Sequence, residues 1–312
     1  MRLRPRPVAA KGGVAVAATT LALAGVACQA PGVHRASQAP AADARPSAIV
    51  LGHRGACAYA PENTLASIDM ARQLGVTWVE NDVQRTKDGH LVVIHDATLA
   101  RTTDARQVYP DRAPWNVSDL TLAQIEKLDA GSWFSSRYAG ERVPTLDRYL
   151  ARVERNRQNL LLEIKEPRRY PGIERQIADT LRRDGWLDQD HVARRLIVQS
   201  FSATSLAAFH RLLPQVTTGL LGNPPVSELK RDAAFADQIN PDGNRVPPGY
   251  FAAVHAVRGP HGRPMRAFAW IVNDPRTAVR LTREGADGII TNKPDVMRKA
   301  LAAVAAPATP KS

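Results

Sequence analysis

The pattern that most constrains the fold of this chain is a regular alternation of short apolar runs with segments of helical periodicity, from residue 48 to residue 305. The apolar runs have the length and the β-branched content of buried strands. We predict principal strands at 48–52, 77–84, 160–165, 196–199, 217–221, 238–240, 265–272 and 288–291. Each is followed by a helix or by a connection that contains one, which is typical of a mostly parallel sheet in a single domain.

Eight strand–helix units predict an α/β fold, a (β/α)8 TIM-type barrel, whose chemistry lies at the carboxyl ends of the strands. The turn 87–89 and the β run 91–95 predict a hairpin on the second strand. Residues 101–145 have no strong period and many aromatics, so we predict a small insertion there, with a short helix near 120–128. An open doubly wound sheet is the alternative, but the turn after the first strand, 53–58, is not the Gly-rich turn that such folds usually carry.

The first 27 residues form a leader that is basic and then apolar. The uncharged run 12–27 is short for a membrane span, and the order of charge and apolarity predicts a secretory signal peptide. The signal peptide could be processed in two ways: by cleavage after the small residues 25–27, or through a lipoprotein box, 23–28, in which Cys28 is lipidated. Residues 28–47 are rich in Ala and Pro and read as a linker, and 306–312 as a tail. We therefore expect an exported protein, periplasmic or lipid-anchored at the bacterial envelope.

The formal net charge is +12; Arg2, Arg4, Arg6 and Lys11 of the leader account for four of these charges, which leaves +8 on the remainder. A basic surface suits anionic partners. The sequence contains no Cys/His finger, helix-turn-helix or aromatic–basic interleaving, so we expect no nucleic acid partner. No protein partner is evident. Cys28 and Cys57 are the two cysteines, and we interpret Cys57 as a small buried residue rather than a nucleophile.

Two strands carry paired charges near their carboxyl ends. Glu80 and Asp82 are two residues apart, so their side chains share a face. Two carboxylates facing together repel unless a cation lies between them, and hard oxygen ligands favour Mg²⁺, Ca²⁺ or Mn²⁺. Glu163 and Lys165 repeat the arrangement on the strand 160–165, where an unpaired lysine would be costly to bury. A salt-bridged pair at a strand end is the structural alternative.

His53 and His95 end two separate β runs, beside these carboxylates. Two histidines at converging strand ends are a candidate acid/base pair. Arg54 has the planar donors that suit phosphate oxygens. Glu62 lies at a helix start, where we also expect Asn63 to cap the helix. Phe201 and Trp270 lie near later strand ends and are candidates for the pocket wall.

Several motifs of this sequence resemble the glycerophosphodiester phosphodiesterases, in the family's order from about residue 49 to about 294. They lie at 53–55, 61–64, 80–84, 88–89, 95–96, 122–131, 143–146, 162–165, 270–273 and 287–291. The first block, His53-Arg54-Gly55 with Pro61-Glu62-Asn63-Thr64, is the most specific. Cys57 departs from the family pattern, in which Ser or Gly is usual near this position.

The resemblance implies a barrel with a small insertion after the second strand and one divalent metal ion, Ca²⁺ or Mg²⁺. By residue, it implies these roles: metal ligands Glu80, Asp82 and Glu163; acid and base His53 and His95; phosphate contacts Arg54 and Lys165; a further site acid Glu62. The implied reaction is hydrolysis of a small-molecule glycerophosphodiester to glycerol 3-phosphate and an alcohol. Two rival functions stay open: a phospholipase D-type enzyme acting on lysophospholipid or sphingolipid headgroups, and a non-enzymatic binding lipoprotein.

Overall fold

A computed structural model describes residues 48–305. The predicted signal peptide, the linker with Cys28, and the tail 306–312 lie outside the described residues, and the predictions made for them stay predictions. Within the described part of the chain, no helix combines the length and the apolar character needed to span a bilayer.

Within residues 48–305, nine strands form one sheet in the order β1-β9-β8-β7-β6-β5-β4-β2-β3, and an additional β1–β2 pairing closes eight of them into a parallel barrel. Their bounds are β1 Ile49–Gly52, β2 Trp78–Arg85, β3 Leu91–Val93, β4 Asn159–Ile164, β5 Leu196–Ser200, β6 Thr217–Leu221, β7 Gln238–Asn240, β8 Arg266–Ala269 and β9 Gly288–Thr291. β3 pairs antiparallel with β2, so the predicted hairpin is present. The predicted barrel is confirmed, and the open sheet is excluded by the closing pair.

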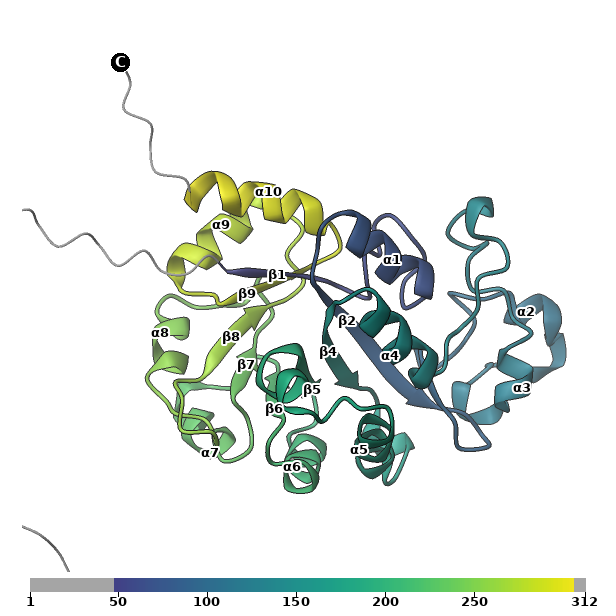
Figure 1. Ribbon diagram of the computed structural model, residues 1–312, viewed down its shortest axis with the longest axis horizontal. Helices are drawn as coiled ribbons and strands as arrows, with labels where there is room; N and C mark the ends of the chain where they lie inside the picture. The colour runs from purple at the N-terminus through teal and green to yellow at the C-terminus, as the bar shows by residue number, and fades with distance from the viewer. Residues whose placement is uncertain (1–47, 306–312) are drawn as a thin grey trace, which may run out of the picture. The chain divides into compact units, whose positions relative to one another are not determined.

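The helices lie on the outside of the barrel, as Figure 1 shows. Their bounds are α1 Leu65–Gln73, α2 Ala105–Val108, α3 Leu122–Ile125, α4 Leu146–Arg155, α5 Ile173–Arg183, α6 Ala203–Leu212, α7 Leu229–Asp232, α8 Tyr250–His255, α9 Pro275–Glu284 and α10 Pro294–Ala305. Short 3₁₀ turns lie at Pro110–Arg112, Val117–Asp119, Ser136–Tyr138, Pro167–Arg169 and Val226–Glu228, and a π turn at His191–Arg195.

Helix α4 illustrates why these segments are helical. Thr145 caps its first turn by accepting a hydrogen bond from the backbone N–H of Arg148 (3.3 Å). Leu146, Tyr149, Leu150 and Val153 recur at helical spacing and are all buried against the sheet. Burial of each such side chain contributes roughly 1.5–3 kcal/mol, so the apolar stripe rather than intrinsic propensity fixes this helix on the barrel.

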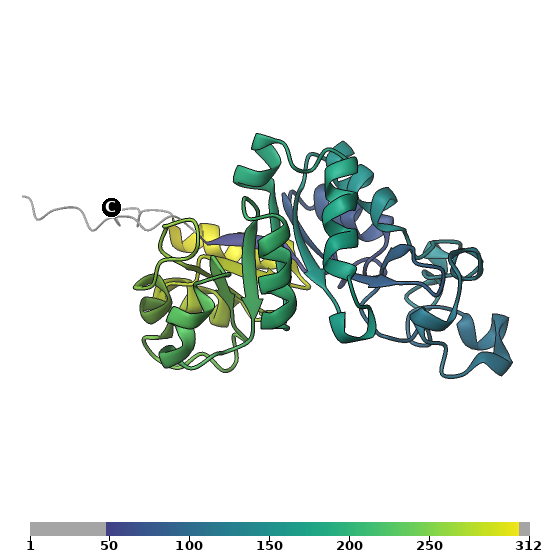
Figure 2. The same ribbon diagram turned by 90° about the horizontal axis from the view of Figure 1, so that it is seen from below.

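The insertion between β3 and α4 forms a separate layer with its own small core, in which Leu99, Val117, Leu120, Ile125 and Leu128 are buried. Figures 1 and 2 both show α2 and α3 set apart from the ring of barrel helices. The helix expected at 120–128 is shorter in the structure: within this range α3, Leu122–Ile125, is helical, and a capping box at Thr121 and Gln124 sets its start.

Two further details differ from the prediction. Strand β8 ends at Ala269 instead of residue 272. The cap of α1 is Thr64, whose hydroxyl accepts from the N–H of Ser67 (3.2 Å), and not Asn63 as expected. Asn63 is used elsewhere, because its side-chain amide donates to Asp82 (2.8 Å).

Candidate active site

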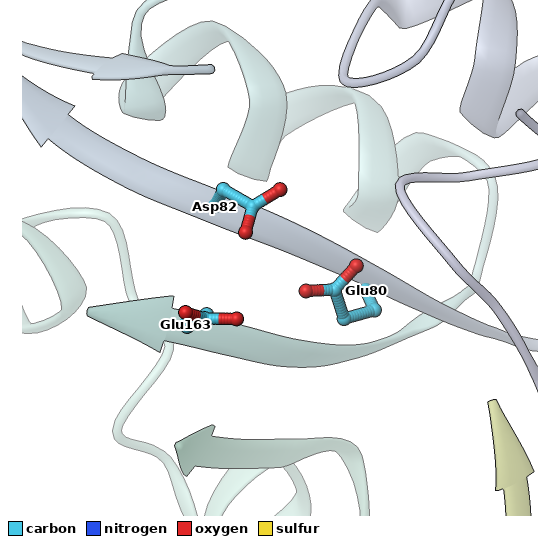
Figure 3. Close-up of side chains that lie close together, drawn as sticks. All are labelled: Glu80, Asp82 and Glu163. Atoms are coloured by element: carbon cyan, nitrogen blue, oxygen red, sulfur yellow. The ribbon is translucent and has the colours of Figure 1, made fainter. Parts of the chain in front are cut away.

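Three carboxylates lie together at the carboxyl end of the barrel. Glu80 and Asp82 point inward from β2, and Glu163 comes from the neighbouring β4, whose register places it directly opposite Asp82. Figure 3 shows the three side chains on these two adjacent strands. All three are buried, and one oxygen of each lies within 4.8 Å of the others. The spacing in sequence places Glu80 and Asp82 on one face, and the parallel register of β2 and β4 adds Glu163 to them.

The electrostatics of this trio fit a cation. Burial, followed by the negative charges of Asp82 and Glu163, raises the pKa of Glu80 well above its ordinary value. Burial and Asp82 likewise raise the pKa of Glu163. The three groups resist being ionised together, and a divalent ion relieves that repulsion. An all-oxygen donor set of this kind suits Ca²⁺ or Mg²⁺.

Two cationic side chains flank the trio. The Lys165 ammonium lies 2.9 Å from Glu163 and 3.6 Å from Asp82. The Arg54 Nε lies 3.4 Å from Asp82. Burial opposes ionisation of Asp82, but the charges of Arg54 and Lys165 outweigh it and hold the pKa of Asp82 below its ordinary value. Asp82 is therefore the member of the trio that stays ionised most easily.

The turn after β1 presents Arg54 in a strained conformation. Its φ is +50°, and its backbone N–H donates to a Glu80 oxygen (2.9 Å). Such backbone strain costs of order 1–3 kcal/mol and persists where the surroundings over-determine it. Gly55 follows with φ +90°, and a Cβ there would lie within 2.7 Å of Ser67. The His-Arg-Gly sequence thus fits a turn that is packed too tightly for a side chain at its third position.

The ring of His53 is held by an amide. Its Nδ1 lies 2.7 Å from the Asn292 side-chain oxygen, which can only accept, so Nδ1 carries the proton and Nε2 is unprotonated. Burial, and then the charge of Arg54, lowers the pKa of His53 to about 4. The ring is therefore neutral near pH 7. Cys57 lies 3.8 Å away, and burial raises the pKa of its thiol to about 12, which agrees with a residue that is not a nucleophile.

The ring of His95 is held by a carboxylate instead. Its Nδ1 lies 2.7 Å from Asp96. The loop that carries both residues is fixed by Gln84 of β2, whose side-chain N–H groups lie 3.0, 2.9 and 2.6 Å from the carbonyls of Ile94, His95 and Asp96. Tyr170 in turn donates to the Gln84 oxygen (2.8 Å). Strand β2 therefore positions His95 as well as the two carboxylates.

A narrow pocket of about 80 Å³ joins these groups. The predicted residues His53, Arg54, Glu80, Asp82, His95, Glu163, Lys165, Phe201 and Trp270 all line it. Phe201 and Trp270 form an edge-to-face pair (5.5 Å, 82°) on the opposite wall. Gln199, which also lines the pocket, accepts from the amide of Asn240 (2.9 Å).

Glu62 lies behind the pocket and not on its wall. Its carboxylate accepts from Arg54 (2.7 Å) and from Arg101 of the insertion (2.7 and 2.9 Å). Sequence reasoning missed Arg101 and Asn292, because both act through contacts with residues far away in sequence and neither interrupts a recognisable period. The amide pair of Asn63 with Asp82 was also missed, although the adjacent Thr64, an equally good cap, left Asn63 free for another role.

Comparisons with known proteins agree with this arrangement. Residues 53–296 match the model of the Glycerophosphoryl diester phosphodiesterase family. The chain is 35% identical over 263 residues to a glycerophosphodiester phosphodiesterase of Bacillus subtilis, covering 80% of this chain and 85% of the relative. It is 34% identical over 251 residues to one of Caldanaerobacter subterraneus, covering 80% and 96%.

Solved structures give the same result. A phosphodiesterase of Oleispira antarctica, solved in complex with its product sn-glycerol-3-phosphate, superposes with a TM-score of 0.68 at 27% identity, over 81% of this chain and 96% of that one. The family match spans the barrel from the turn after β1 into α10, and includes every residue that lines the pocket. This chain belongs to the glycerophosphoryl diester phosphodiesterase family.

Proposed function

We propose that this protein is an exported, metal-dependent hydrolase that cleaves glycerophosphodiesters to glycerol 3-phosphate and an alcohol. The observation that carries the proposal is the single pocket that joins an acidic trio, two cationic side chains and two histidines. Such a combination suits a phosphodiester, which needs charge neutralisation at its oxygens and proton transfer at both the attacking and the leaving oxygen. A binding protein has no need of two histidines beside three carboxylates.

Glu80, Asp82 and Glu163 are the residues that would hold the metal ion, since they offer oxygen ligands from two rigid strands. When bound, a Ca²⁺ or Mg²⁺ ion supplies Lewis-acid polarisation of phosphate oxygens. Asn63 hydrogen bonds to Asp82 and fixes the rotamer of that carboxylate. Ligands oriented in this way by a second residue bind with less loss of side-chain entropy.

Arg54 and Lys165 are proposed to contact the phosphate. Arg54 presents a planar guanidinium whose Nη1 is anchored on Glu62, and Lys165 presents a point charge anchored on Glu163. Both cations lie on the pocket wall, so they would neutralise the non-bridging oxygens as charge develops in the transition state.

The two histidines are proposed to divide the proton transfers. His53 is neutral with an unprotonated Nε2, which is the state required of a proton acceptor for the attacking oxygen. His95 then serves as the donor that protonates the leaving alkoxide, with Asp96 fixing its ring. The attacking oxygen belongs either to water or to a hydroxyl of the substrate glycerol.

A groove beside the pocket supports a polar leaving alcohol. Its volume is about 680 Å³, and it shares Glu163, Lys165 and Phe201 with the pocket. Much of its wall is polar, with Glu166, Arg168, Ser202 and Thr204 among its residues. These polar groups suit a hydrophilic leaving alcohol. Glycerophosphodiesters and lysophospholipids release the same kind of headgroup, so the activity measurement below separates the two substrate classes.

The deciding measurement is the release of glycerol 3-phosphate from glycerophosphocholine by purified protein, before and after EDTA treatment and after Mg²⁺ or Ca²⁺ is restored. We expect release that EDTA abolishes and a divalent ion restores. Cleavage of lysophosphatidylcholine without cleavage of glycerophosphocholine would instead establish the phospholipase D-type alternative. Absence of cleavage of both would leave the binding lipoprotein.

Export, to the periplasm or to a lipid anchor at the envelope, is proposed from the leader alone, whose basic start and apolar run are typical of signal peptides. The experiment compares wild-type protein with a Cys28→Ser variant in cell fractions. A lipidated protein partitions with membranes and becomes soluble in the variant, whereas a cleaved periplasmic protein is soluble in both. Retention of the intact leader in the cytoplasm would contradict export.

A further inference from the structure

Arg101, the first residue of the insertion, bridges two carboxylates at the rim of the pocket. Its Nε and Nη2 donate to the two oxygens of Asp96 (2.7 and 2.9 Å). Its Nη1 and Nη2 donate to the two oxygens of Glu62 (2.9 and 2.7 Å). One guanidinium therefore contacts both oxygens of both groups and uses four of the five N–H donors of arginine.

Each of these carboxylates also holds a residue that lines the pocket. Asp96 contacts the Nδ1 of His95 at 2.7 Å, and Glu62 contacts the Nη1 of Arg54 at 2.7 Å. The result is a continuous row of alternating charges and rings in the order His95, Asp96, Arg101, Glu62, Arg54. It connects the proposed proton donor to the proposed phosphate contact, around the outside of the pocket.

We propose that Arg101 is a positioning residue that fixes the His95 ring through Asp96 and the Arg54 guanidinium through Glu62. This inference rests on the proposed function, because it assigns a role in the same reaction. Arg101 does not line the pocket itself, so it acts through its two partners.

The protonation states of the two carboxylates agree with this role. Hydrogen bonds from Arg101 are the main cause that lowers the pKa of Asp96 far below its ordinary value. Burial opposes ionisation of Glu62, but Arg101 and Arg54 outweigh it and lower the pKa of Glu62 too. Both carboxylates stay ionised near pH 7 and act as hydrogen-bond acceptors only.

The insertion holds Arg101 in place from the outer side. The Trp133 ring lies 6.0 Å from the Arg101 guanidinium carbon, and Trp133 packs edge-to-face on Phe134 (5.7 Å). Phe134 continues to Tyr138 (5.8 Å), whose hydroxyl donates to the Tyr59 carbonyl (2.9 Å) in the loop after β1. The insertion thus contacts the loop that carries Arg54 both through Arg101 and through this aromatic row.

A set of variants of the full-length protein tests the proposal: Arg101→Ala, Arg101→Lys, Asp96→Asn and the double variant Arg101→Ala/Asp96→Asn. Arg112→Ala is the matched control, since Arg112 is an exposed arginine of the same insertion with no side-chain hydrogen bond among the described residues. We expect Arg101→Ala to lower kcat on glycerophosphocholine about 10- to 100-fold, as losses of orienting partners typically do. KM should rise less, by about threefold, since Glu62 loses one of its supports while Arg54 keeps its own contacts to Glu62 and Asp82.

Arg101→Lys should stay within about threefold of Arg101→Ala, because one ammonium cannot reproduce two bidentate contacts. The kcat of the double variant should lie within about threefold of that of Asp96→Asn, because both changes remove the same support of the His95 ring. Independent, multiplying effects would overturn the proposal, as would a wild-type kcat in Arg101→Ala or Arg101→Lys. Melting temperatures of all variants separate these results from loss of the fold, and the lysine variant, which keeps the charge, remains informative if the alanine variant unfolds.

A second readout does not require activity. In protein labelled with ¹⁵N-histidine, Arg101→Ala should shift the ring signals of His95, assigned through His95→Gln, whereas Arg112→Ala should leave them in place. An unchanged His95 signal in Arg101→Ala contradicts the positioning role. If the wild-type protein cleaves no diester, the proposed function fails, and this measurement still decides whether Arg101 holds the His95 ring.

Discussion

The two sides of the pocket are built on different principles. The charged sector comes from β1, β2, β4 and the loops after β1, β3 and β4, and consists of His53, Arg54, Glu80, Asp82, His95, Glu163 and Lys165. The neutral sector comes from β5, β6, β8 and β9 with the loops after them, and consists of Gln199, Phe201, Leu221, Trp270, Ile271 and Ile290. Both sectors line the same 80 Å³.

The difference lies in what holds each side chain. In the charged sector, Arg54, Asp82, Glu163 and Lys165 are fixed by one another through ion pairs. Burial and neighbouring charge also displace the pKa values of Glu80 and Glu163. In the neutral sector, Trp270 is fixed by a backbone carbonyl, that of Asn240 (2.7 Å), and by packing against Phe201. Because the charged side chains depend on one another, substitutions there should cause large, cooperative losses of activity. Substitutions in the neutral sector should have small effects that add independently.

The largest effect is expected from the carboxylate trio. The double variant Glu80→Ala/Asp82→Ala should lose divalent metal binding, measured by calorimetry, and lower kcat/KM at least about a thousandfold, as removal of several kcal/mol of charge stabilisation requires. Glu284→Gln, which changes an exposed acid on α9, is the control. Metal binding that survives in the double variant would remove Glu80 and Asp82 from the ligand set.

The two histidines should separate by leaving group. His95→Gln should lower kcat about 10²- to 10⁴-fold on glycerophosphocholine but far less on a p-nitrophenyl ester of glycerol 3-phosphate, whose leaving group needs no proton. His53→Gln should lower kcat on both substrates. The measurement is the ratio of the two rates for each variant, and the reverse pattern would exchange the proposed roles of the two rings.

A smaller effect is expected in the neutral sector. Phe201 is 55% exposed at the edge of the pocket and the groove. Phe201→Ala should raise KM about 2- to 10-fold, the equivalent of one aromatic contact, with kcat nearly unchanged. Val226→Ala, equally exposed at 55% but outside the lining of both, should change neither. A kcat loss as large as that of the histidine variants would mean that the neutral sector takes part in the chemistry.

The smallest effect is expected in the insertion that supports the charged sector. Burial opposes ionisation of Asp129, but the N–H groups of Ser132, Gly140 and Gly131 outweigh it and lower the pKa of Asp129 to about 2 from 3.8. A lowered carboxyl pKa gives stability that is present above the unfolded value and is lost as the pH falls through the folded one. Protection of these three amides against hydrogen exchange should therefore fall between about pH 4 and pH 2 in the wild type, and much less in Asp129→Asn. Equal pH dependence in both proteins would contradict this account.

Much of the fold could be predicted from the sequence, because local periodicity indicates strands such as β4 and helices such as α5. The pocket residues could be predicted as well, since Glu80 and Glu163 stand at the ends of recognisable strands. Arg101, Asn292 and the role of Asn63 could not. Their partners are set by the register of parallel strands and by the packing of loops, which no local pattern encodes. The family resemblance implied roles for the residues in the pocket, but not for Arg101, Asn292 and Asn63, which hold those residues in place.

Strand β2 carries Glu80, Asp82 and Gln84 at alternate positions, so all three point to the same side of the sheet. A single-residue insertion or deletion before Glu80 would turn all three to the opposite side at once. The length of β2 is thus far less open to change than that of the segment 101–145, in which residues 110–114 are all exposed. Changes of substrate specificity are therefore best introduced in exposed loops of the insertion, while the length of β2, and with it the alternation of its side chains, is kept unchanged.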